Sequence, residues 1–204
     1  MITALRATSQ TLAAVLRARF LAEPSLAALF GAGGATVSLA TPDEMVRRRE
    51  VGLSIWLYRL IRDDMTLNRQ EERSGFDTFR RVPLPLRLHY LLTPMLSSSA
   101  DQAPETEQHI LGAVLQTFHD HQSLGGADLA GDFAGTSTEL RVHLESLALD
   151  EITRIWDSLE RSYQLSVSYE VSVVEVASRR PDLGDRVVIT PRARSGLARA
   201  GASP

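Results

Sequence analysis

The stretch that decides the fold is YQLSVSYEVSVVEV, at residues 163–176. Apolar residues alternate along it with polar ones, the period of two that is typical of a β-strand with one face in a core. The apolar face consists of Leu165, Val167, Tyr169, Val171 and Val173. The opposite, serine-bearing face should be exposed, lightly packed or covered by a partner. As the last long strand, this segment is also a candidate for edge pairing between subunits.

Segments upstream predict further strands of the same sheet. ELRVHLESL at residues 139–147 and LRLHYLLTP at 86–94 alternate in the same way, and the second closes at Pro94. VGLSIWLYRLIR at 51–62 is apolar on both faces, which indicates a central strand covered on each side. A short β-like segment lies at 36–40.

Three segments have the apolar period of an amphipathic helix: residues 3–22, a segment that begins at Pro104 and continues through Phe118, and residues 150–160. Glu23-Pro24 should end the first helix. Helix, strands, helix, strand, helix, strand is the order of an α+β or mixed α/β protein. We therefore predict a single sheet of four or five strands with two or three helices packed on it.

Two segments break this regular pattern. Residues 63–83 are polar and charged, and we expect a long excursion that forms a mobile hairpin and contacts another protein. Residues 125–135 begin and end with glycine and predict a flexible loop.

The composition is that of an ordinary globular domain. The chain has 204 residues, of which 44% are apolar and 23% charged. No apolar run is long enough to cross a bilayer, and no secretory signal is recognisable at the amino terminus, so we expect a cytoplasmic protein that contacts no membrane. The absence of cysteine excludes disulfides, a thiolate nucleophile and cysteine-ligated metal sites.

Charge is distributed unevenly along the chain. Every basic residue is arginine; residues 1–19 carry +3 and 178–204 carry +4, whereas residues 20–177 hold 13 arginines against 23 acidic residues. We divide the chain into a domain at 1–177 and a basic C-terminal arm at 178–204, in which only RVVIT (186–190) can form a strand. Basic ends suit contact with the acidic body of a neighbouring copy; solvated tails are the alternative. Nucleic acid is not expected as a partner.

The histidines do not predict a metal centre. His119 and His121 flank Asp120, with His109 ten residues before the first of them, but residues two apart point about 200° apart on a helix and cannot share one ion. A helix end stabilised by histidine explains them better. His89 and His143 occupy the polar phase of strands, where a solvent-facing or hydrogen-bonded side chain is usual.

No other motif predicts catalysis. Glu71-Glu72 and the pair Glu105/Glu107 lack an apolar pocket that would separate their pKa values. The glycine-rich run at 31–34 is followed by no lysine, so it is not a phosphate-binding loop, and there is no G-x-S-x-G. We predict no enzyme and no cofactor. The large aromatic residues on strand or helix faces are core or interface anchors: Trp56, Trp156 and Tyr169.

Five segments together resemble one family. They are SIWLYRL (54–60), PLPLRLHYLLTP (83–94), ILGAVLQTFHDH (110–121), LRVHLESLALDEITRIWDSL (140–159) and YQLSVSYEVSVVEV (163–176). Their order and spacing resemble the cap, or tail-terminator, proteins of phage-tail-like contractile injection systems, over residues 5–177. Ala148 departs from the capping serine that often begins the helix after 147, which bears on local helix stability only.

The resemblance implies a homohexameric ring on the last ring of inner tube and sheath, which ends their polymerisation and anchors the sheath during contraction. Its partners would be copies of itself and the tube and sheath proteins, within a particle assembled in the cytoplasm that can be released from the cell. The residues that we assign to subunit, sheath or tube interfaces lie in the excursion and the arm: Asn68, Arg69, Arg80, Arg81, Arg179, Arg180, Val187, Ile189, Arg192 and Arg194.

Two alternatives stay open from the sequence. One is another ring protein of the same particle, either a baseplate component or an adaptor that initiates the tube. The other is a small enzyme or ligand-binding α+β domain, which should be a monomer or dimer with a defined pocket.

Overall fold

The computed structural model describes residues 2–32, 34–64, 72–73, 78–80, 82–96, 103–176 and 183–184. Only the backbone is described at 72–73, 78–80, 173 and 183–184. Among the described residues, no helix is both long enough and apolar enough to cross a membrane.

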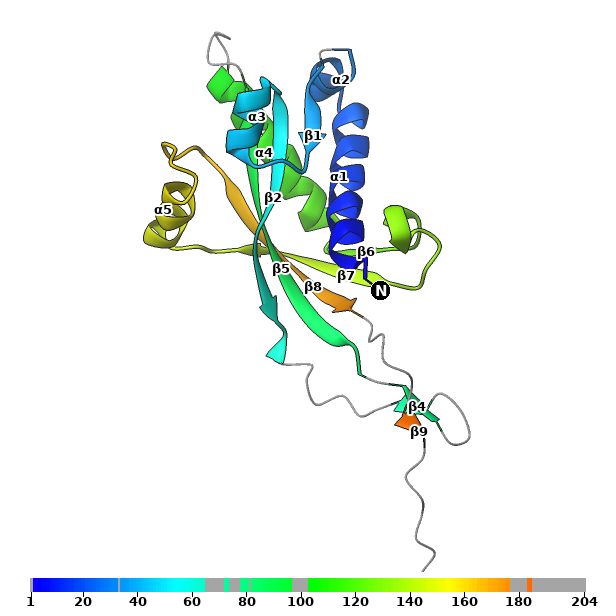
Figure 1. Cartoon of the computed structure of the whole chain (residues 1–204). Helices are drawn as coiled ribbons and strands as arrows, with labels where there is room; N and C mark the ends of the chain where they lie inside the picture. Colours follow the sequence, from blue (N-terminus) through cyan, green and yellow to red (C-terminus); the bar gives the residue numbers. More distant parts are fainter. Residues whose placement is uncertain are drawn as a thin grey trace, which may run out of the picture.

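A six-stranded sheet forms the centre of the fold (Figure 1). In spatial order its strands are β1 (Thr36–Ser38), β2 (Gly52–Arg62), β5 (Leu84–Met95), β8 (Val167–Val176), β7 (Glu139–Glu145) and β6 (Ser123–Gly125). β1 runs parallel to β2 and every other neighbouring pair is antiparallel. The α+β class is confirmed, with more strands than the four or five predicted.

The long strand β8 lies inside this sheet. It pairs with β5 on one side and with β7 on the other, so our expectation that it offers a free edge to another subunit was wrong. Alternation reveals which faces of a strand are apolar, but it carries no information about which strands lie on either side. The edges of the sheet are the three-residue strands β1 and β6.

Five helices are described: α1 (Ala4–Ala22), α2 (Pro24–Phe30), α3 (Pro42–Arg48), α4 (Ala103–Asp120) and α5 (Leu149–Asp157). The sequence predicted α1, α4 and α5 but missed the two seven-residue helices. α3 begins with a reciprocal cap in which Thr41 Oγ1 accepts from the Glu44 N–H and Glu44 Oε2 accepts from the Thr41 N–H. That Thr-Pro-x-Glu pattern was a recognisable start signal.

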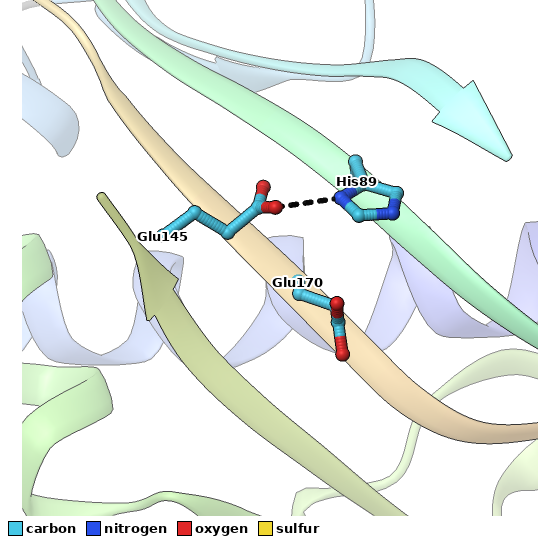
Figure 2. Close-up of side chains that lie close together, drawn as sticks. All are labelled: His89, Glu145 and Glu170. Carbon is cyan, nitrogen blue, oxygen red and sulfur yellow. Dashed lines mark hydrogen bonds and ion pairs between the residues drawn. The ribbon is translucent and has the colours of Figure 1, made fainter. Parts of the chain in front are cut away.

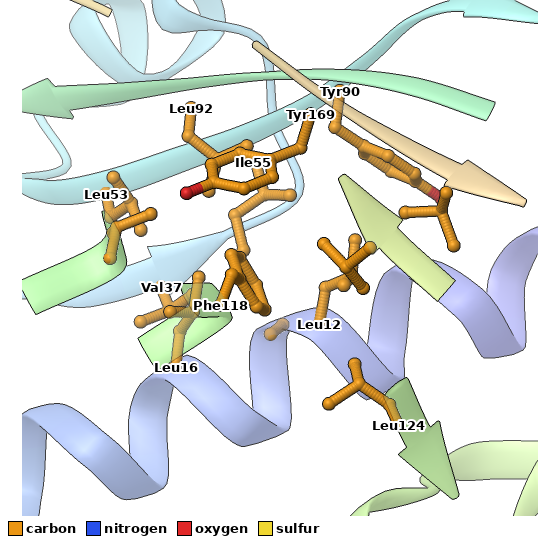
Figure 3. Packing of buried hydrophobic residues seen from close by; sticks show 14 of the residues in the cluster. Leu12, Leu16, Val37, Leu53, Ile55, Tyr90, Leu92, Phe118, Leu124 and Tyr169 are labelled. Atoms are coloured by element: carbon orange, nitrogen blue, oxygen red, sulfur yellow. The ribbon is translucent and has the colours of Figure 1, made fainter. Parts of the chain in front are cut away.

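The main core lies between one face of the sheet, the inner face, and the helices α1 and α4 (Figures 1 and 3). Leu12 and Leu16 of α1 and Phe118 of α4 point toward the strands. Phe118 meets Tyr169 of β8 edge to face, with ring centroids 5.0 Å apart. The strands contribute their alternating apolar residues, among them Leu53, Ile55, Leu88, Tyr90, Leu92, Val142 and Val171.

The opposite face of the sheet, the outer face, is partly covered by α3 and α5. Met45 of α3, Leu91 of β5 and Trp156 of α5 are fully buried yet lie outside the main core cluster. Leu91 alternates with Tyr90 and Leu92 and therefore points to the outer face. This second cover explains why β5, predicted to be half-buried, is buried on both faces for most of its length.

The segment at residues 125–135 is packed, and our expectation of a flexible loop was wrong. It forms two 3₁₀ turns, Gly126–Asp128 and Gly131–Phe133, and buries Leu129 and Phe133 in the core. The Ala130 N–H donates to Thr11 Oγ1 of α1 at 3.0 Å. Two buried apolar anchors within a glycine-rich segment hold its backbone against the helix.

The 63–83 excursion contains the hairpin that the sequence predicted. β3 (Glu72–Arg73) pairs with β4 (Thr78–Arg80), and β4 also pairs with β9 (Leu183–Gly184), which belongs to the C-terminal arm. The backbone thus brings the excursion and the beginning of the arm together. The RVVIT segment lies outside the described residues, and the domain boundary at 177 stays a prediction.

Candidate functional site

A network of polar side chains lies on the outer face, across four adjacent strands. Strand register brings the network together, because His89 of β5 stands opposite Glu170 of β8 and Glu145 of β7 stands opposite Ser168 of β8. The carboxylate of Glu145 reaches toward the His89 ring, and Nδ1 of His89 lies 2.8 Å from Glu145 Oε1 (Figure 2).

Glu145 is the acceptor at the centre of the network. His89 Nδ1–H donates to one carboxylate oxygen, and the Ser168 hydroxyl donates to the other at 2.6 Å. The Tyr58 hydroxyl is 3.4 Å from that second oxygen and 3.1 Å from Ser168 Oγ. A carboxylate only accepts hydrogen bonds, so the contact assigns a proton to Nδ1 of His89. Burial raises the pKa of Tyr58, which therefore stays a hydroxyl donor.

Arg87 neutralises two further carboxylates of the network, those of Asp63 and Glu170. Arg87 donates through Nε and Nη2 to Asp63 Oδ1, at 3.0 and 2.8 Å, and its Nη1 lies 3.7 Å from Glu170 Oε2. The hydrogen bond to Asp63 is the main cause that raises the pKa of Arg87. Arg87 therefore bridges the end of β2 to the centre of the sheet.

His89, Glu145 and Glu170 have the residue types of a cation site, and their nearest ligand atoms lie within 4.8 Å of one another. The contacts favour a structural interpretation instead. Glu145 already accepts from His89, Ser168 and Tyr58, and Glu170 is paired with Arg87, so both carboxylates are compensated by protein groups. His89 is 3% exposed, and its Nε2 has no hydrogen-bond partner among the described residues.

The network holds the base of a projecting segment. Glu145 is the last residue of β7, and the chain then leaves the sheet as residues 146–165, which include α5 and which we call the α5 arm. Tying Glu145 to three other strands fixes the direction in which the arm departs. Figure 1 shows α5 standing apart from α1 and α4, with the sheet between them.

Further contacts fix the arm against the outer face. Trp156 is buried, and its Nε1–H donates to Ser166 Oγ at 3.4 Å. Arg161 donates to Asp43 of α3 at 3.3 Å. Hydrogen bonds from Arg47 first, and then from Arg161, lower the pKa of Asp43. At the start of α5, Glu151 accepts from the Ala148 N–H and supplies half of the cap that alanine cannot complete.

A shallow groove of about 380 Å³ separates the arm from β2. Trp56 and Tyr58 form its wall on the strand, and Leu147 and Ile155 face them from the arm. The prediction that the large aromatic residues act as anchors is confirmed for two of them, since Trp156 is 1% and Tyr169 2% exposed. Trp56 is only partly buried and lines this open groove.

The interface residues assigned from the sequence are not tested by this structure. Arg80 lies in β4, where only the backbone is described. The others lie outside the described residues: Asn68, Arg69, Arg81, Arg179, Arg180, Val187, Ile189, Arg192 and Arg194. Their roles stay predictions.

The sequence missed the polar network, although it placed His89 correctly. A hydrogen-bonded histidine was one of the two expected outcomes, and His89 is hydrogen-bonded and buried. Its partner Glu145 is 56 residues away along the chain, and only the strand order brings the two together. The serine face is covered at Ser166 and Ser168, which are both buried. The position of Glu145 at the end of an alternating strand was the one sequence feature that could have indicated the network.

The chain belongs to the Pvc16 N-terminal domain family, whose model matches residues 7–189. The fold is similar to that of the sheath/tube terminator of the extracellular contractile injection system PVC, with a TM-score of 0.58 and 21% identity. That match covers all of this chain and 65% of the terminator.

A second solved structure, the tube-terminating cap of the anti-feeding prophage, matches 76% of this chain and 51% of its own length, at 20% identity and a TM-score of 0.48. No curated protein matches the chain.

Proposed function

We propose that this protein is a cap, or tail terminator, of a contractile injection system. It forms a homohexameric ring on the last rings of inner tube and sheath, ends their polymerisation and anchors the sheath. The observation that carries the proposal is membership of the Pvc16 N-terminal domain family, supported by a fold similar to a sheath/tube terminator over the whole chain.

A terminator must be a ring whose two faces differ. Its lower face must fit the last ring of tube and sheath, whereas its upper face must not reproduce that surface, so that head-to-tail stacking stops. An α+β protomer with helices α1 and α4 on one face of a sheet and the α5 arm on the other presents two dissimilar surfaces of this kind.

The ring contacts the sheath through the excursion and the C-terminal arm. The arginines of the C-terminal arm contact acidic surfaces of a neighbouring protomer. The 63–83 excursion or the RVVIT segment pairs with the sheath, either by donating a strand to it or by receiving a strand from it. The pairing of β9 with β4 supports this assignment, because it places the start of the arm beside the hairpin.

The protein acts by assembly and carries out no reaction. The polar network supports this, since its carboxylates are engaged by donor groups of the protein itself. The cap resides in the cytoplasm as part of the assembling particle and leaves the cell only with it.

Electron microscopy of particles made with and without the gene tests the proposal. Without the cap, tubes and sheaths should have uncontrolled lengths or fall apart, and restoring the gene should restore one length. Particles of normal length and stability without the cap would contradict it. A chain truncated after residue 177 tests the role of the C-terminal arm separately. If the truncated cap still closes particles, the C-terminal arm is not needed for the interface.

A further inference from the structure

The α5 arm carries exposed apolar side chains that its own protomer does not cover. Leu149 is 76% exposed, Tyr163 48% and Leu165 47%. They stand on a segment that is held firmly at its base by Glu145 and at its far side by Arg161. Tyrosine is enriched at the centres of protein contacts, and several exposed apolar side chains on one anchored projection form a surface that such a contact can bury.

The outward side of α5 carries one acidic residue, Asp157. Leu149, Thr153 and Asp157 recur every four residues and form one exposed strip. The arm as a whole contains four acidic residues and two arginines. Asp157 has no cationic partner among the described residues.

A surface of complementary character lies on the other face of the same protomer. Helix α1 contains three arginines and no acidic residue. Arg17 and Leu21 lie one turn apart on its exposed side, and Leu21 is 47% exposed. Arg17 donates to the Val37 carbonyl at 3.2 Å and has no carboxylate partner among the residues described.

We propose that the α5 arm docks antiparallel on helix α1 of a second copy of this chain, with Leu149 against Leu21 of the neighbour. Leu149 and Asp157 are two turns apart and Leu21 and Arg17 only one, so the long Arg17 side chain extends toward the amino end of α1 to reach Asp157. The two surfaces lie on opposite faces of the sheet, so one protomer cannot pair them with each other (Figure 1). Dissimilar surfaces on opposite sides generate head-to-tail contacts, which close into a ring when the rotation permits. The inference rests on the proposed cap ring and names the contact that closes it.

Cysteine cross-linking of the full-length chain tests the contact, because the natural sequence has no cysteine. The doubly substituted chain Leu149→Cys/Leu21→Cys, oxidised in solution and in assembled particles, should give a ladder of covalent oligomers. The matched control Leu149→Cys/Leu115→Cys replaces an exposed leucine on α4 instead and should give none. Equal yields from the two pairs would overturn the proposal.

A charge exchange provides a second, independent test. Asp157→Arg and Arg17→Asp, each alone, should weaken self-association by about tenfold or more, because like charges then face each other. The double variant should recover most of the loss. Glu139→Arg, which reverses an exposed acid outside the arm, should leave association unchanged.

The outcomes separate this contact from the cap function. Rings at the particle end that give no covalent ladder from the Leu149→Cys/Leu21→Cys chain would overturn the contact and leave the cap role intact. A ladder from copies that are absent from the particle end would keep the contact and contradict the cap role. A chain that stays monomeric in solution and on particles would overturn both.

Discussion

Replacing Glu145 with alanine should destabilise the fold more than an exposed glutamate replacement can. The carboxylate is the shared acceptor for His89, Ser168 and Tyr58. After its removal Tyr58 can turn to solvent and Ser168 can turn to the Tyr90 carbonyl, 3.5 Å away, but the buried Nδ1–H of His89 loses its acceptor. The loss of one charge-assisted bond to a buried donor costs roughly 2–3 kcal/mol.

Urea unfolding followed by tryptophan fluorescence measures this cost, since Trp156 is buried in the arm that the network anchors. With a slope of about 2 kcal/mol per molar urea, the midpoint should fall by about 1–1.5 M at a fixed chain concentration. Glu145→Gln, which keeps an acceptor oxygen but loses the charge, should lose only about 1 kcal/mol.

The matched control is Glu139→Ala on the same strand. The Glu139 side chain is 56% exposed and accepts from the Ser123 hydroxyl at the surface, so its loss should stay within about 0.5 kcal/mol. If Glu145→Ala and Glu139→Ala unfold at the same urea concentration, the network does not anchor the fold and the account of the site is refuted.

Three other perturbations have definite outcomes. Leu16→Ala opens a cavity in the core and should cost about 2–5 kcal/mol in the same assay, whereas Leu39→Ala, at an exposed position outside the proposed contact, should cost little; equal losses would contradict the packing. Gly52→Ala should prevent folding or lower the thermal midpoint by more than ~5 °C, because Gly52 has φ +136° and an added Cβ would lie 2.0 Å from the Thr36 carbonyl oxygen; an unchanged midpoint would show that β1 does not lie there. The Arg161–Asp43 contact should weaken in acid, because the pKa of Asp43 is lowered in the folded state. The Asp43 carboxylate therefore stabilises the folded chain fully at pH values above its unfolded pKa of about 4, and this stabilisation is lost as the pH falls through its folded pKa. Protection of the α5 amides from hydrogen exchange, corrected for the intrinsic rate at each pH, should therefore fall in acid in the natural chain, and Asp43→Asn should abolish that fall. Identical acid responses of the two chains would show that the Arg161–Asp43 contact does not hold the α5 arm.

Strands and long helices were predictable because their apolar periods extend over many residues. β8 and α1 illustrate this, since each carries an uninterrupted alternating or helical pattern. Short elements are harder to predict: α2 and β6 are fixed mainly by what they pack against, and α3 carries a local start signal at Thr41–Glu44 but only seven residues of helix. Met45 of α3, for example, is buried against the outer face of the sheet, which no local pattern reveals.

The polar network could not be predicted for a related reason. His89, Glu145 and Glu170 come from three strands, and their proximity depends on strand order and register. The resemblance identified the family from the order of five segments, yet it named no residue of the network. The arginines that the sequence singled out lie mainly outside the described residues.

The most direct test of the central claim is cryo-electron microscopy of complete particles that contain this chain. We expect a single six-membered ring of it at the end of tube and sheath away from the baseplate, with no copies along the shaft. Copies at the baseplate, along the shaft or nowhere on the particle would contradict the account.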